Sequence, residues 1–374
     1  MRNGRKLIAL IAFCLMLTVL CTASADVQDT NGNGLVDMGD IVSFGSYPQS
    51  RVQDSTLLET LNSLVQSPDT AAGWTSYGYW DSGEAADYAL YQDVELDGEA
   101  YRAVWMSSYR PELKADAATA ENSYIDDNGY ELNTVYWFRW EPIEWIVLEY
   151  SEGSALLSAK DAMFSNAYQD YTEAGKSASY VEGTETYANN WELSTIRGIL
   201  NGSFLEEAFT EEEAALLTEQ RLDNVNTAAK PESKFCRDQA ETTDKVFLLS
   251  YSDLRNEAYG YASTVSYSKA TQGDKANDTS DATVVEAMKR RRSYTDYAAI
   301  TGVRGSVQVV TLDGDPGLAW MLRSAGTSST SVQMVNKYGS LEASNTQPKD
   351  LSQIGNSSNG IVPAIRVMIE QEVQ

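Results

Sequence analysis

The sequence predicts an α+β fold made mostly of antiparallel β-strands with a few short helices. Three observations indicate this class. Short apolar runs that alternate with polar residues are separated by Gly, Asn, Ser and Pro turns along most of the chain, which is typical of antiparallel sheets. Helical spacing of apolar side chains is confined to short segments. Apolar residues make up 43% of the 374 residues and aromatic residues 10%, which is a globular composition.

The expected elements follow from these patterns in chain order. Alternation and turn residues predict strands at residues 41–48, 88–96, 101–106, 134–140, 143–149, 155–158, 243–250, 307–312, 318–324, 332–335 and 361–369. Helical spacing predicts helices at residues 55–65 with a Ser55 cap, at 193–200 with a Ser194 cap and at 210–217 with a Thr210–Glu213 capping box, and a short one at 253–261. Asp97-Gly98 predicts a hairpin turn, and Pro142 is expected to separate two strands.

Several classes of site are excluded by the residue types that the chain lacks. There is no histidine, so there is no Ser-His-Asp or Cys-His catalytic pair and no His-ligated zinc. Two of the three cysteines lie within the first 25 residues, so Cys236 stands alone and is expected to be a small buried residue. A nucleic-acid partner is not expected, because the net charge of −26 would be repelled by a phosphate backbone.

Residues 1–25 have the pattern of a cleaved signal peptide. Basic residues precede an apolar run of roughly fifteen residues, which is shorter than a membrane span needs, and Ala23-Ser24-Ala25 supplies the small residues of a cleavage site. Cys21 also suggests lipid anchoring, but Leu20 is bulkier than the residue usual before an acylated cysteine. We therefore expect a secreted, extracellular protein without a membrane span.

Residues 26–40 form an acidic leader, rich in Asn and Gly, with one candidate calcium site. Oxygen-bearing residues occupy positions 1, 3, 5, 9 and 12 of a twelve-residue loop, and Gly34 occupies position 6, a spacing that lets a loop wrap a hard cation. The loop resembles that of dockerin modules, but it has no entering helix and no second loop. The expected ligands are Asp29, Asn31, Asn33, the carbonyl of Leu35, Asp37 and Asp40. A flexible leader that binds no metal is the alternative.

An ordered set of motifs carries a family resemblance. The segments are Phe44-Gly-Ser-Tyr-Pro-Gln49, Tyr101-Arg102, Arg110-Pro111, Asn128-Gly129-Tyr130, Val135-Tyr-Trp137-Phe, Glu141-Pro-Ile-Glu-Trp145-Ile-Val-Leu148, Thr243-Asp-Lys-Val-Phe-Leu-Leu-Ser-Tyr251, Trp320-Met-Leu-Arg-Ser324 and Gly360-Ile-Val-Pro-Ala-Ile-Arg366. Together they resemble secreted proteins of Gram-positive gut bacteria that carry the domain of unknown function DUF6273. The resemblance covers roughly residues 41–369 and implies a single domain followed by a tail at 370–374. It implies no activity.

The chain departs from the family pattern at two places. Met321 stands where a second Trp is common, and residues 269–292 form a polar insertion that ends in the basic run 289–292. That run is expected to be a solvated helix face. The last part of the chain also resembles the C-type-lectin-like fold. The reactive cysteines that formylglycine-generating enzymes of that fold use near their C-terminus are absent here.

Aromatic and charged residues in two places are the candidates for ligand recognition. Trp320, Arg323 and Ser324 combine an aromatic face with a guanidinium group that can bind a carboxylate. The alternative is that Trp320 belongs to the core and Arg323 pairs with an acid. Trp74 and Trp80 lie in a Gly- and Ser-rich context that suits an exposed aromatic platform.

These patterns favour a non-catalytic extracellular protein that binds glycan or protein ligands. The first alternative is a carbohydrate or cell-wall hydrolase that works through carboxylates, for which Glu141 and Glu144 are the nearest pair to a strand bend. The second alternative is a structural, surface-associated protein. No catalytic residue is assigned, and calcium is the one cofactor expected.

Overall fold

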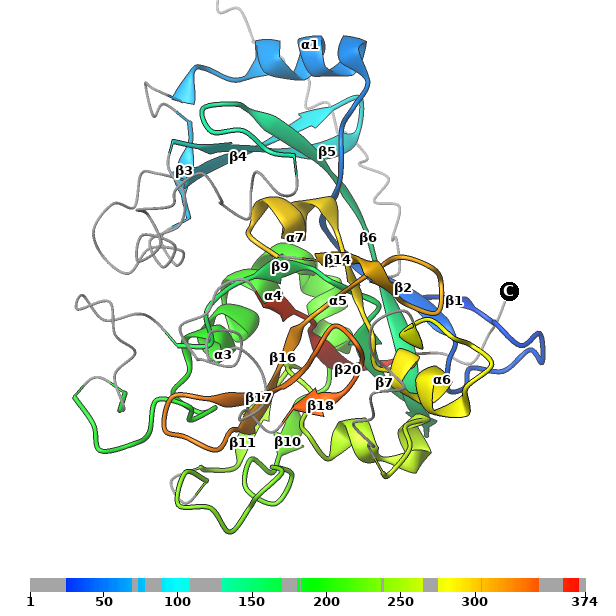
Figure 1. The fold of residues 1–374 in the computed structure, drawn as a ribbon. Coiled ribbons are helices and arrows are strands. Elements are labelled where there is room, and N and C mark those ends of the chain that lie inside the picture. Colours follow the sequence, from blue (N-terminus) through cyan, green and yellow to red (C-terminus); the bar gives the residue numbers. More distant parts are fainter. Residues whose placement is uncertain are drawn as a thin grey trace, which may run out of the picture.

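The computed structural model describes most of the chain. The described residues are 25–68, 73–77, 89–107, 129–169, 180–181, 183–236, 239–264, 275–303, 305–342 and 359–369. They form the α+β fold that the sequence predicts, with short helices around mostly antiparallel sheets (Figure 1). None of the described helices is long and apolar enough to cross a membrane.

A nine-stranded sheet organises the molecule. Its strands are β1 (Asp26–Gln28), β2 (Ile41–Arg51), β3 (Thr75–Ser76), β4 (Ala89–Leu96), β5 (Glu99–Met106), β6 (Tyr136–Ser151), β7 (Ser154–Ala159), β12 (Val246–Phe247) and β20 (Ala364–Met368). The order along the main path is β12-β20-β7-β6-β5-β4-β3, and β2 pairs with both β6 and β1. The predicted hairpin joins β4 to β5, and Asp97 and Gly98 both adopt the positive φ that its tight turn requires.

The longest strand, β6, contradicts the expected break at Pro142. Pro142 lies opposite Ser46 of β2, at a shift of register in the ladder between the two strands. Gly45, at this shift, has a φ of +69° and provides the bulge. Because a bulged ladder leaves a position without a backbone hydrogen bond, a proline that lacks an N–H is accommodated there, and the strand continues.

A second, five-stranded sheet has the order β18-β17-β16-β19-β9. Its strands are β9 (Phe164–Ser165), β16 (Trp320–Ala325), β17 (Val332–Val335), β18 (Leu341–Glu342) and β19 (Gly360–Ile361). Three two-stranded pairs complete the sheets: β8 (Asp161–Ala162) with β13 (Ser293–Tyr294), β10 (Gln220–Leu222) with β11 (Thr242–Asp244), and β14 (Gly305–Val310) with β15 (Pro316–Leu318). The β8–β13 pair is parallel and sets Asp161 opposite Ser293.

The helices are short and begin at side-chain caps in most cases. They are α1 (Ser55–Leu64), α3 (Thr195–Asn201), α4 (Ser203–Ala208), α5 (Glu211–Leu216), α6 (Ala282–Met288) and α7 (Asp296–Ile300), with 3₁₀ turns η5 (Asp253–Arg255) and η6 (Glu257–Tyr259). The predicted capping box at Thr210 and Glu213 is confirmed. The cap of α1 is Asp54 rather than Ser55, because its carboxylate accepts the N–H of Leu57.

Two hydrophobic cores stabilise the fold. The larger one lies between the two sheets and the helices α3, α4 and α7 and contains Trp145. The smaller one lies between α1 and the β4–β5 hairpin and includes Leu61, Trp74 and Trp137. In Figure 1 the elements of the smaller core form the upper part of the molecule, and β6 runs from it into the main body. Trp137 and Trp145 are fully buried.

Candidate functional site

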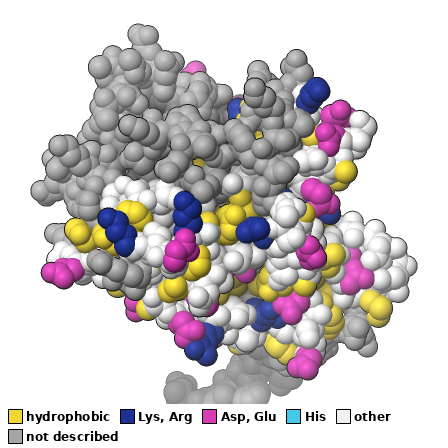
Figure 2. Space-filling model, turned by 60° about the horizontal axis from the view of Figure 1, so that its bottom comes forward, with side chains coloured by type: hydrophobic (Ala, Val, Ile, Leu, Met, Phe, Trp, Pro, Cys, Tyr) yellow, Lys and Arg dark blue, Asp and Glu magenta, His cyan; other side chains and the backbone are white. Residues whose placement is uncertain are grey.

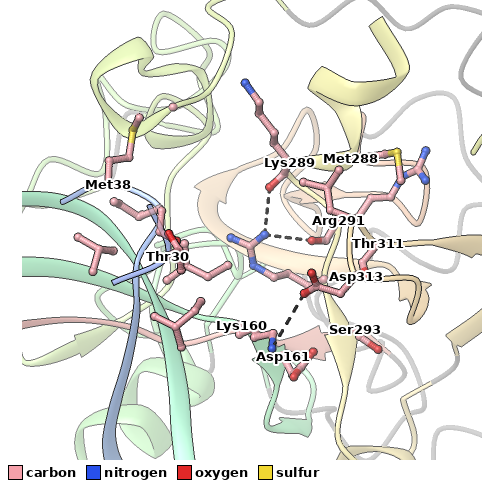
Figure 3. Close-up of a pocket in the computed structure, with 18 of the residues that line it drawn as sticks. Thr30, Met38, Lys160, Asp161, Met288, Lys289, Arg291, Ser293, Thr311 and Asp313 are labelled. Carbon is pink, nitrogen blue, oxygen red and sulfur yellow. Dashed lines mark hydrogen bonds and ion pairs between the residues drawn. The ribbon is translucent and has the colours of Figure 1, made fainter. Parts of the chain in front are cut away.

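A pocket of about 550 Å³ opens beside the leader loop. Its walls come from the segment between β1 and β2, the middle of β6, the start of β8, the turn after η6, the end of α6 and the loop between β14 and β15. Figure 3 shows Thr30 and Met38 on one side of this space and Thr311 and Asp313 on the other. The size is typical of a small-molecule site.

The floor of the pocket is apolar. Ile41 of β2 and Ile146 and Leu148 of β6 line it because β2 and β6 pair in register at this point, with Ile41 opposite Ile146. Met288, from the end of α6, and Met38, from the leader loop, add flexible thioether side chains. Such a surface takes up an apolar group of a ligand.

Lys160 and Asp161 place charges of both signs at the end of the floor. They follow β7 directly, and β8 begins at Asp161. The Lys160 amine donates to the Glu144 carboxylate at 2.8 Å and lies 4.0 Å from Asp313, as the dashed line in Figure 3 marks. The hydrogen bond to Glu144 raises the pKa of Lys160. Burial raises the pKa of Asp161 to about 6 against the opposing charge of Lys160.

The basic run 289–292 is not the solvated helix face that its composition predicts. Arg290, Arg291 and Arg292 are each 2–3% exposed. In the described part of the chain none of them has a carboxylate at ion-pair distance, and each donates instead to main-chain carbonyl groups. Burial lowers the pKa of Arg291 to about 10. The prediction was wrong because carbonyls of segments distant in sequence, such as those of Leu254 and Val310, receive the guanidinium groups of Arg290 and Arg291.

Arg292 also lines the pocket. Its guanidinium donates to the carbonyls of Lys289 and Arg291 and to the Tyr261 hydroxyl, at 3.0–3.1 Å. Its charge also lies 5.6 Å from the centre of the Trp320 ring, a cation–π distance. Its Nε is buried and has no hydrogen-bond partner in the described part of the chain. The pocket therefore holds a fixed positive charge close to Asp161.

Acidic and apolar side chains form the rim. Asp313 and Asp315 are exposed, and so are Leu312 (56%) and Met38 (50%) on opposite sides of the opening. On the face shown in Figure 2, basic, acidic and hydrophobic side chains are interspersed, so the large net negative charge does not gather there into one acidic patch.

The predicted recognition residues on β16 are buried. Trp320, Arg323 and Ser324 are 0%, 3% and 1% exposed. The Trp320 indole donates to the Arg290 carbonyl at 3.1 Å, and the Arg323 guanidinium donates to Asp253 at 2.8 Å. Ser324 Oγ accepts the N–H of Tyr251. These side chains offer no surface to a ligand, and the alternative reading of Trp320 as core and Arg323 as an ion-pair partner is the one that the structure bears out.

The expected aromatic platform is not exposed where it is described. Trp74 is 9% exposed, belongs to the smaller core and donates its indole N–H to the Gln66 carbonyl at 3.0 Å. Trp80 lies outside the described residues. An exposed strip that includes Trp74 is therefore excluded by the packing of α1 against the hairpin.

The leader loop gathers four of the predicted calcium ligands. Asp29 accepts the backbone N–H groups of residues 31, 32 and 34, and the bond from Gly34 is the main cause of its lowered pKa. The Asn31 and Asn33 side chains both reach the Asp37 carboxylate, at 2.9 Å and 2.7 Å. Calcium prefers carboxylate and amide oxygens, whereas the amide N–H groups of Asn31 and Asn33 are the atoms that face Asp37 here.

Asp40 lies apart from that cluster. Its side chain is fully buried, and its carboxylate accepts the N–H and hydroxyl of Thr30 and the N–H of Asp37. Among the described residues, no three Asp, Glu or Cys side chains are grouped closely enough to hold a metal. Asp40 thus fastens the base of the loop. Leu35, the predicted carbonyl ligand, has an exposed side chain.

The other candidates have structural partners. Glu141 accepts from the backbone and hydroxyl of Ser50, and Glu144 pairs with Lys160. Cys236 is buried and free, as predicted, and burial raises its pKa.

Of the pocket residues, Lys160 and Asp161 were not predicted from the sequence, and Arg292 was expected only as part of a solvated basic run. The one signal in the sequence was the pair of opposite charges directly after an apolar strand.

Comparisons with known proteins yield one match. Residues 152–369 match a family described as "Domain of unknown function (DUF6273)". No curated protein and no solved structure matches the chain. The matched region begins just before β7 and includes the charged end of the pocket, whereas β2 and most of β6, which supply the floor, precede it.

Proposed function

The chain belongs to the DUF6273 family, whose description states no function, and we propose that it is a non-catalytic binding protein that works outside the cell. The observation that carries this proposal is the pocket beside the leader loop, in which an apolar floor ends at Lys160, Asp161 and Arg292. An apolar cavity with a few fixed polar groups is the usual form of a ligand site. The extracellular location is supported by the signal-peptide pattern of residues 1–25, of which residues 1–24 lie outside the described residues.

Filling the pocket tests the proposal. Ile146→Trp would place an indole on the floor, and Ile199→Trp makes the same change at a partly buried position on α3 that does not line the pocket. We expect arrays of glycans and peptides to show binding by the parent and by Ile199→Trp, and loss of that binding in Ile146→Trp. Equal binding by all three proteins would refute the proposed site.

We propose further that calcium binds the leader loop through Asp29, Asn31, Asn33, Asp37 and the Leu35 carbonyl. Thr30, Met38 and Gly39 of the same loop line the pocket, so a bound ion would order one pocket wall. Calorimetric titration with calcium should give a binding signal for the parent and for Asp26→Ala, an exposed acid just outside the loop, and none for Asp29→Ala. Identical traces for Asp29→Ala and the parent would rule out calcium binding at this loop.

One observation favours hydrolysis by carboxylates as a second candidate function. Asp161 has a raised pKa and lies near the charge of Asp315 in the same pocket. A glycosidase needs one carboxyl group that stays protonated beside one that is ionised. Release of reducing sugar from cell-wall polysaccharide by the parent, and its loss in Asp161→Asn, would replace the binding proposal with this one. The C-type-lectin-like fold stays a prediction.

A further inference from the structure

We propose that the pocket binds the free amino terminus of a peptide whose first residue is apolar. This inference rests on the proposed function, since it names the ligand of the same site. The ammonium group would lie at Asp161, the first side chain on the apolar floor, and the first carbonyl oxygen toward Arg292. Three features of the pocket support this arrangement.

The first feature is a shortage of hydrogen-bond donors for the acids. The carboxylates of Asp161 and Asp315 have no side-chain or backbone donor in the described part of the chain. The cations around them are already engaged within the protein. Lys160 donates to Glu144, and the guanidinium of Arg292 donates to two carbonyls and a phenol. An ammonium group from a ligand would supply the donors that these acids lack.

The second feature is the state of Asp161. Burial makes its ionised form costly, and this cost outweighs the favourable charges of Lys160 and Arg292, which Asp315 and Glu144 oppose. A ligand that brings a positive charge therefore gains more from Asp161 than a neutral sugar hydroxyl does, because the gain from a new charge pair is larger where water is excluded. This favours an amine over a glycan.

The third feature is the apolar floor next to that carboxylate, together with the charge of Arg292. Ile41, Ile146 and Leu148 line the same pocket as Asp161, and they suit one aliphatic side chain. Arg292 is 2% exposed, and its Nε lacks a partner in the described part of the chain. A peptide carbonyl at this wall would lie beside the Arg292 charge, while the Nε itself is too buried for a ligand atom to reach. An ammonium, an aliphatic group and a carbonyl occur together at a peptide amino terminus.

Calorimetry with three short peptides tests the inference. The probes are Leu-Gly-Gly, its N-acetyl form, and Gly-Gly-Gly, titrated into the full mature chain. We expect Leu-Gly-Gly to bind, and the loss of either the ammonium or the leucine side chain to weaken binding about tenfold or more. Asp161→Asn should weaken the binding of Leu-Gly-Gly to the same degree as acetylation of the peptide does. It should not further weaken the binding of the acetylated peptide. Asp315→Asn removes a second negative charge, at an exposed position of the same pocket, and tests the attraction for the ammonium group independently.

The dependence on pH gives an independent readout. Binding of Leu-Gly-Gly should weaken as pH falls through about 6, where Asp161 takes up a proton amid Lys160, Arg292, Asp315 and Glu144. It should also weaken above about 8, where a peptide amino group loses its proton. In Asp161→Asn the affinity for Leu-Gly-Gly should no longer fall at low pH and should still fall at high pH.

The outcomes separate the two proposals. Equal binding of the free and acetylated peptides would overturn the inference. The inference would also be overturned if the protein bound glycans but not Leu-Gly-Gly. If Ile146→Trp then abolished the glycan binding, the pocket would still be the binding site and the proposed function would stand. Binding of Leu-Gly-Gly that Ile146→Trp leaves unchanged would overturn both.

Discussion

At the scale of single residues, the position of a charge relative to water decides its role. Asp161 and Arg292 are important because they lie half-buried and buried in one pocket, and not because acids or bases are scarce in the chain. Asp29 shows the opposite case. It is an exposed acid whose pKa is lowered by backbone N–H groups of its own loop, the Gly34 N–H foremost, which favours the ionised form that a cation needs.

The raised pKa of Asp161 predicts that this residue lowers stability at neutral pH. The folded state holds the proton up to a pH of about 6 and the unfolded chain up to about 4. The stabilising effect of the protonated form is complete below pH 4 and is lost as pH rises to 6. Asp161→Asn should therefore raise the free energy of unfolding at pH 7 by up to about 3 kcal/mol, and the gain should vanish below pH 4.

Urea unfolding of both proteins between pH 3.5 and pH 7.5 measures this difference. Asp313→Asn, at an exposed rim position, is the matched control and should change stability little at any pH. A gain in Asp161→Asn of equal size at every pH would show that packing rather than ionisation is responsible.

At the scale of elements, local sequence signals predicted the helix caps and tight turns. They failed where contacts with distant segments determine the structure. The Ser194 cap, the Thr210 capping box and the Asp97-Gly98 turn depend on neighbours within a few residues, so the sequence predicts them. The passage of β6 through Pro142 depends on a bulge at Gly45. Burial of the basic run depends on carbonyl groups of η5 and its neighbours, which no local pattern reveals.

Arg290 ties the end of α6 to the η5–η6 segment. Its guanidinium donates to the carbonyls of Leu254, Glu286 and Ala262 at 2.8–3.1 Å. Arg290→Met keeps much of the side-chain volume and leaves those buried carbonyls without donors, so the free energy of unfolding should fall by about 3 kcal/mol. Lys289→Met is the control. Its amine is half-exposed and pairs with Glu286, so its loss should cost less than about 1 kcal/mol. Equal costs in urea unfolding would contradict the buried role of Arg290.

At the scale of the whole molecule, two cores are joined by one long strand and one buried cation. β6 contributes Trp137 to the smaller core and Trp145 to the larger one. Beside it, Arg102 of β5 binds Asp93 of β4 through two hydrogen bonds at 2.7 and 2.8 Å and reaches Glu207 of α4 at 3.0 Å. The side chain is 1% exposed and thus fastens the hairpin to the main body.

Arg102→Met should loosen the β4–β5 hairpin from the rest of the fold. The change leaves Asp93 and Glu207 without their shared partner, at a cost of about 2–3 kcal/mol, moderated because both acids keep contact with water. Hydrogen exchange should quicken in β4 and β5 and stay slow in β7 and β20, since those strands belong to the larger core. Arg139→Met is the control, because Arg139 contacts Tyr101 of the same hairpin and no residue of α4. If exchange quickened equally in β4 and β20, the hairpin would be part of one cooperative unit, and Arg102 would act on global stability rather than as a link between two cores.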